Sequence, residues 1–201
     1  NLYWGAMYGV KTFLPKQSGW KVLHTQSRPA PLILERLVLF HEALNLTVVA
    51  DAWQGMAIRE ATAAFLEYAA GRTNVDVFYS GGKHIKAGSG AGLVVYMGHN
   101  GLMDFSLPFY PLKNDAVQRD AVIFACQSKR YFTDAIKAGG AYPLLRTTGN
   151  MAPEAYILHA LLTSWGREDE EAALREEVAK AYNHYQKCGM KAARNLFAAG
   201  W

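Results

Sequence analysis

Two apolar runs decide how this sequence is interpreted: LVVYM at residues 93–97 and AVIFA at residues 121–125. Both runs are continuously apolar instead of alternating, which is typical of strands that are covered on both faces in a parallel sheet. Polar residues follow each run at once, GHNG at 98–101 and CQS at 126–128. The pattern predicts two buried strands with chemically active side chains at their carboxyl ends.

Outward from these runs, strands and helices are predicted to alternate. Further strands are expected at 20–25, 46–50 and 142–147, with a strand or hairpin arm at 75–79. Apolar residues at helical spacing predict five helices. The first is opened by Pro29 and Pro31, and the second follows Gly55. The others are expected at 131–138, from Pro153 to Trp165, and from 168 onward. The alternation predicts an α/β three-layer sandwich with a mainly parallel sheet.

The length of 201 residues favours a single domain. Within it, residues 1–19 are expected to form an N-terminal helical extension, 20–165 the α/β core, and 166–201 a C-terminal helix. Hydrophobic residues make up 51% of the chain and charged residues 19%, which excludes a disordered protein.

Composition also narrows the classes of partner. The net charge of +4 comes from scattered Lys and Arg residues, so no nucleic-acid partner is expected. No apolar run approaches the roughly 20 residues of a membrane helix, so no membrane span is expected. Two cysteines cannot form a disulfide framework, and no metal-ligand spacing or cofactor motif is found. The missing initial Met is consistent with a secreted or periplasmic protein, and the compartment and the oligomeric state stay open.

Four polar residues fall at predicted strand ends, where open parallel sheets bind their ligands: His24, Asp51, His99 and Cys126. His99 and Cys126 are the informative pair, because histidine is the usual partner that activates a thiol as a nucleophile. The alternatives are that Cys126 fills the core and that His99 only forms a turn. Cys188, beside Gly189, is interpreted as a thiol that packs on the last helix.

The sequence resembles the caspase-like cysteine peptidases, the clan that includes caspases, legumain, gingipains and clostripain. The resemblance rests on an apolar block that ends in histidine and a second block that ends in Ala-Cys. It implies that His99 is the general base and acid, that Cys126 is the nucleophile, and that the Gly101 and Cys126 amides hold the oxyanion. Asn100 stands between His99 and Gly101, where the family has His-Gly.

The sequence therefore predicts a cysteine hydrolase, in particular a peptidase that acts on peptide or protein substrates. Asp51 is expected to bind a basic residue before the scissile bond, with Trp53 lining the same pocket; the alternative is that Asp51 caps the next helix. A non-catalytic α/β domain that binds a peptide or small ligand in the same crevice is the competing interpretation. A third, an amidotransferase-like enzyme, lacks its Gly-x-Cys-x-Gly elbow at Cys126.

Overall fold

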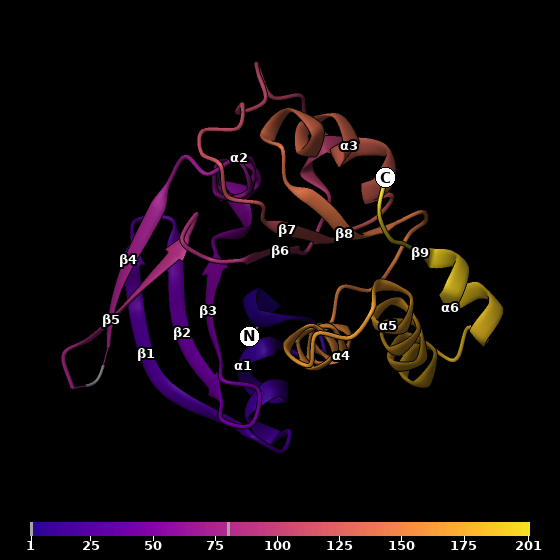
Figure 1. Cartoon of the computed structure of the whole chain (residues 1–201), viewed down its shortest axis with the longest axis horizontal. Coiled ribbons are helices and arrows are strands. Elements are labelled where there is room, and N and C mark those ends of the chain that lie inside the picture. The colour runs from indigo at the N-terminus through magenta and orange to yellow at the C-terminus, as the bar shows by residue number, and fades with distance from the viewer. Residues whose placement is uncertain (1, 80) are drawn as a thin grey trace. The chain divides into compact units, whose positions relative to one another are not determined.

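The computed structural model describes residues 2–79 and 81–201 and has a mixed α/β fold (Figure 1). Its α-helices are α1 (Val10–Phe13), α2 (Ile58–Ala69), α3 (Ser128–Gly139), α4 (Ala155–Gly166), α5 (Glu171–Gln186) and α6 (Met190–Leu196). Its strands are β1 (Trp20–Ala30), β2 (Ile33–His41), β3 (Leu46–Trp53), β4 (Asn74–Tyr79), β5 (Lys83–Gly88), β6 (Leu93–Met97), β7 (Asp120–Phe124), β8 (Tyr142–Thr147) and β9 (Phe197–Ala198). Short 3-10 helices are η1 (Leu2–Trp4), η2 (Leu14–Lys16), η3 (Gly55–Ala57) and η4 (Gly101–Met103).

The described chain folds into two compact units that interleave along the sequence. Unit 1 comprises residues 1–57, 79–83 and 154–194, and unit 2 comprises residues 58–78, 84–153 and 195–201. Each unit is described by itself below. The expectation of one domain with an extension over 1–19 and a core over 20–165 stays a prediction.

Unit 2 is built on the two apolar runs that the sequence singled out. Strands β6, β7 and β8 are parallel neighbours, and β9 joins the edge of β8 in the antiparallel direction. Helices α2 and α3 lie along the same face of these strands (Figure 1). Residues 121–125 of the central strand are fully buried, which explains why the run contains no polar residue. Each buried large side chain contributes roughly 1.5–3 kcal/mol, so β7 is the best-anchored strand of the unit.

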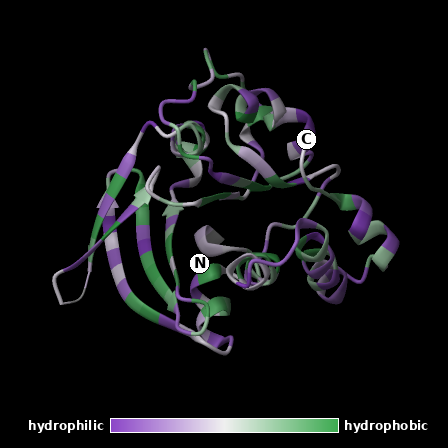
Figure 2. Cartoon of the chain, in the orientation of Figure 1, coloured by the Kyte–Doolittle hydropathy of each residue, from purple (hydrophilic) through white to green (hydrophobic). Residues whose placement is uncertain are grey.

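Unit 1 contains a three-stranded antiparallel sheet in the order β1-β2-β3. Its middle strand corrects the prediction of a helix opened by Pro29 and Pro31, because residues 33–41 form β2. Leu37, Val38 and Leu39 are all buried, so consecutive side chains on both faces of β2 are covered. Much of β2 is correspondingly hydrophobic in Figure 2. Residues 46–50 do form a strand, but β3 is antiparallel to β2 and belongs to this separate sheet.

The two ends of the chain are helical in shorter pieces than predicted. Residues 2–16 form η1, α1 and η2 instead of one helix. The expected C-terminal helix is two helices, α5 and α6, because Lys187 and Gly189 adopt positive φ angles of 55° and 85° between them. Cys188 lies in this break and is exposed, so its predicted packing on a helix is wrong. Among the helices of the described residues, none combines the length and apolarity that crossing a membrane requires.

Candidate active site

The strands that precede His99 and Cys126 are side by side, as their sequences predicted. β6 and β7 pair in parallel over their whole length, with Met97 opposite Phe124 at the carboxyl end. The backbone N–H of Gly98 continues the pairing by donating to the Phe124 carbonyl at 3.1 Å. The loops that carry His99 and Cys126 therefore leave the sheet at the same edge, which is where parallel sheets place their ligand sites.

A buried asparagine joins these two loops. Asn100 is fully buried, and its Nδ2 donates to the Cys126 carbonyl oxygen at 2.6 Å. Its Oδ1 accepts from the Leu102 backbone N–H at 3.1 Å, which caps η4. Both ends of the Asn100 amide are thus used inside the protein. The residue that departs from the His-Gly pattern of the caspase-like family is the one that ties the histidine loop to the cysteine loop.

The hydroxyl of Tyr96 fixes the backbone around His99. It donates to the His99 carbonyl at 2.7 Å and accepts from the Thr62 hydroxyl at 3.4 Å. Burial raises the pKa of Tyr96, and its hydrogen bonds with Thr62 and Gly101 offset part of that rise, so the hydroxyl stays protonated and can donate. The Gly101 amide follows this fixed segment and stays a predicted oxyanion donor.

The imidazole of His99 contacts a carboxylate that the sequence interpretation missed. His99 Nε2 lies 2.5 Å from Asp104 Oδ2, and both side chains are more than half exposed. A neutral imidazole that donates from Nε2 to a carboxylate keeps Nδ1 as the acceptor, so the contact selects one tautomer. Asp104 lies five residues after His99 in the same loop, and that short spacing was the only signal of it in the sequence.

Cys126 lies half-buried where β7 turns into α3. The backbone N–H of Met151 donates to its Sγ at 3.4 Å, and the Met151 carbonyl lies 3.7 Å from the sulfur. Met151 belongs to the loop after β8, so the third parallel strand also contributes to this edge. Two hydrogen bonds fix the turn that follows β7. Ser128 Oγ donates to the Ile123 carbonyl at 2.8 Å, and Thr147 Oγ1 donates to the Ala125 carbonyl.

Gln127, directly after the cysteine, has an unusual backbone. It adopts the left-handed conformation at φ 51°, ψ 33°, although glycine or asparagine suits that region better. Its N–H donates to the Gly149 carbonyl at 2.8 Å, and its Nε2 donates to Asn150 Oδ1 at 3.1 Å. The loop after β8 thus holds Gln127 through both its backbone and its side chain.

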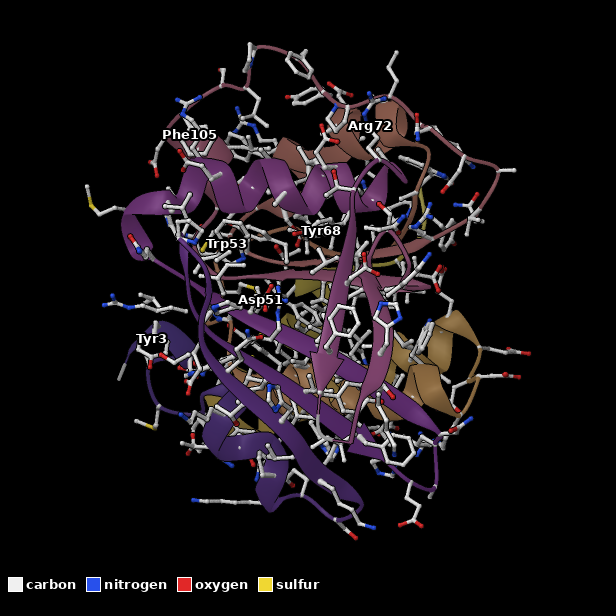
Figure 3. The ribbon with its side chains drawn as sticks, turned by 90° about the vertical axis from the view of Figure 1, so that its left-hand side faces the viewer. Tyr3, Asp51, Trp53, Tyr68, Arg72 and Phe105 are labelled. Carbon is white, nitrogen blue, oxygen red and sulfur yellow. The ribbon has the colours of Figure 1, made fainter. Side chains whose placement is uncertain are left out.

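Asp51 and Trp53 do not lie at the end of a parallel strand. Both side chains come from β3 of the antiparallel sheet in unit 1, which corrects the basis of their predicted pocket (Figure 3). Asp51 binds Arg36 of the neighbouring strand through two hydrogen bonds of 2.6 and 2.7 Å. Both partners are largely buried, with side-chain exposures of 8% for Arg36 and 16% for Asp51. This pairing also replaces the alternative that Asp51 caps a helix.

Within residues 2–79 and 81–201, no group of three or more His, Cys, Asp or Glu side chains is placed to hold a metal ion. A cavity of about 430 Å³ lies between α4 and α5 in unit 1, with His159, Arg167, Lys180 and His184 among its lining residues. It contains none of the residues that the sequence selected.

Comparison of the chain with protein-family models, with curated proteins and with solved structures found no match in any of the three. The chemistry of the site therefore has to be argued from its own residues.

Proposed function

We propose that this protein is a cysteine hydrolase that cleaves peptide bonds, with Cys126 as nucleophile and His99 as general base and acid. One observation carries the proposal. The two loops leave neighbouring parallel strands at the same edge and are joined by the 2.6 Å hydrogen bond from Asn100 to the Cys126 carbonyl. We also propose that the fold around this edge is a caspase-like three-layer sandwich.

The reaction divides among the site residues as follows. His99 Nδ1 accepts the thiol proton, and the Cys126 sulfur attacks the substrate carbonyl carbon to give a tetrahedral oxyanion. The oxyanion collapses to a thioester as the C–N bond breaks, and His99 gives its proton to the leaving amine. Water then hydrolyses the thioester with His99 again as base, which regenerates the thiol and releases a carboxylic acid.

Supporting residues orient the imidazole and stabilise the oxyanion. Asp104 holds His99 through Nε2, so that Nδ1 stays available to the thiol. The Cys126 amide is retained as an oxyanion donor. The Gly101 amide is retained as well, and the Met151 N–H is added as a third donor because it lies 3.4 Å from Sγ.

The first test is the reactivity of the two thiols. Iodoacetamide at neutral pH should alkylate Cys126 at least about tenfold faster than the exposed Cys188, as measured by peptide mass spectrometry. H99A and D104N should slow the reaction at Cys126 and leave Cys188 unchanged, so Cys188 serves as the internal control. A panel of fluorogenic peptides should be cleaved by the wild type and not by C126S.

The same measurements can overturn the proposed hydrolase activity. Equal rates at Cys126 and Cys188, together with no cleavage of any peptide, would overturn the hydrolase. The same crevice would then be assigned to binding a peptide or small ligand without catalysis.

A further inference from the structure

Two side-chain amides stand next to the proposed nucleophile. Gln127 follows Cys126 directly, and Asn150 precedes Met151, whose backbone touches the sulfur. Their amides are hydrogen bonded at 3.1 Å, and both groups lie at the surface of unit 2. No step of the proposed reaction uses either side chain.

The hydrogen bond between the two amides leaves a defined set of donors and acceptors. Each amide has one oxygen and one NH₂ group, and the bond consumes an NH₂ proton of one residue and a lone pair of the other. If the oxygen and nitrogen positions of both side-chain amides are exchanged, Asn150 becomes the donor and Gln127 the acceptor. In either assignment the pair still presents an acceptor oxygen on one residue and an NH₂ donor on the other.

The backbone of Gln127 indicates that the position of this pair is imposed by the surrounding structure. The left-handed conformation costs a residue with a Cβ about 1 kcal/mol or more, and it is held here by the Gly149 carbonyl. The conformation turns the Gln127 side chain onto Asn150. A glycine at position 127 would adopt the left-handed conformation without this cost, but it has no side-chain amide to contact Asn150.

We propose that Gln127 and Asn150 recognise an amide group of the substrate beside Cys126, either a backbone peptide group or a primary carboxamide. An amide offers one N–H and one C=O, which match the acceptor and the donor that the pair presents. An ester of the same shape lacks the N–H and loses one of the two hydrogen bonds. The inference rests on the proposed function only in taking Cys126 as the reacting group, and it names the substrate class.

The test compares two reagents that differ only in this group. Iodoacetamide and methyl iodoacetate each alkylate a thiol by forming an S–C bond, breaking the C–I bond and releasing iodide and a proton to solvent. For each reagent the rate at Cys126 is divided by the rate at Cys188 of the same molecule, which removes the intrinsic reactivity of the reagent. The amide-to-ester ratio obtained in this way should be about three to ten, the value of one hydrogen bond.

Variants assign that preference to the two side chains. Q127A and N150A should each bring the ratio close to one. Q127G should do the same while suiting the backbone conformation, so a loss of folding cannot explain its result. Q118A, which removes an exposed glutamine that donates to the Gly140 carbonyl, is the matched control and should keep the wild-type ratio.

The two proposals fail in different ways. An amide-to-ester ratio near one in the wild type, or a ratio that Q127A, N150A and Q127G leave unchanged, would overturn amide recognition even if Cys126 is fast and peptides are cleaved. A preserved ratio at a Cys126 that is no faster than Cys188 would support amide recognition and count against the hydrolase.

Discussion

At the residue scale, Asn100 is the side chain on which the proposed site depends most. Its buried amide serves two backbone groups on different loops, the Cys126 carbonyl and the Leu102 N–H. A side chain of similar size without these groups would leave both part-buried backbone groups without this partner. Such unpaired groups cost more than the hydrogen bonds contribute when present.

We expect N100L to lower the free energy of unfolding by about 1–3 kcal/mol, because one part-buried acceptor and one part-buried donor lose their partner. The measurement is urea denaturation with the slope of the transition compared between proteins. N114A is the control, because the Asn114 Nδ2 makes a similar bond to the Gly71 carbonyl at 3.3 Å on the exposed surface. A change below about 0.5 kcal/mol in N100L would show that the tie contributes no stability.

The residues of the candidate site were only partly visible in the sequence. His99 and Cys126 could be selected because each follows an apolar run that is buried in the sheet. Met151 and Asn150 could not, because they act through loop geometry that no spacing encodes, and Asp104 had only its short distance from His99 along the chain as a signal. Met151 contributes a backbone group, so its side chain carries no signal at all.

At the element scale, β2 shows why a helix was predicted wrongly. Ile33, Leu37 and Phe40 fall at helical spacing, because residues 37–40 of the strand are apolar on both faces and a continuous apolar run matches both periods; Leu44 lies in the turn that follows. Pairing decided the outcome: Leu37 lies opposite Ala50 and Val38 opposite Val49. These partners are more than ten residues away, beyond the reach of local propensity. Runs 93–97 and 121–125 were interpreted correctly because each is too short for a helix.

The same sheet places Asp51 in a structural role. We expect D51N to lower the free energy of unfolding by about 3 kcal/mol, because a largely buried Arg36 loses its carboxylate. Thermal or urea unfolding measures this loss. E42Q removes the exposed pair with Lys21, which water screens, and should change the free energy of unfolding much less than D51N does. Equal, small effects in both variants would return Asp51 to the set of candidate substrate-binding residues.

At the scale of the whole molecule, stability should depend on pH through a half-buried histidine of unit 1. Burial lowers the pKa of His159 below its ordinary 6.5, and the charge that His41 carries when protonated lowers it further. The unfolded chain therefore binds this proton more readily than the folded one. The resulting stability is fully present above pH 6.5 and is lost as the pH falls through the lowered pKa.

We accordingly expect the free energy of unfolding to decrease between pH 7 and pH 5, and H159Q to reduce that slope. Denaturation series at half-unit pH steps measure both proteins. A slope in H159Q as steep as in the wild type would assign the pH dependence to other groups.

Two carboxylates make the first residues part of the folded protein. Glu35 accepts from Trp4 Nε1 and Lys11 Nζ, both at 2.6 Å, and Glu154 accepts from the backbone N–H groups of Met7 and Tyr8. Both glutamates are buried residues. A protease that removes residues up to Tyr8 takes away both backbone donors of Glu154 and the Trp4 donor of Glu35, which then keeps only its ion pair with Lys11. Cells degrade unstable chains faster, so loss of this segment should shorten the lifetime of the protein.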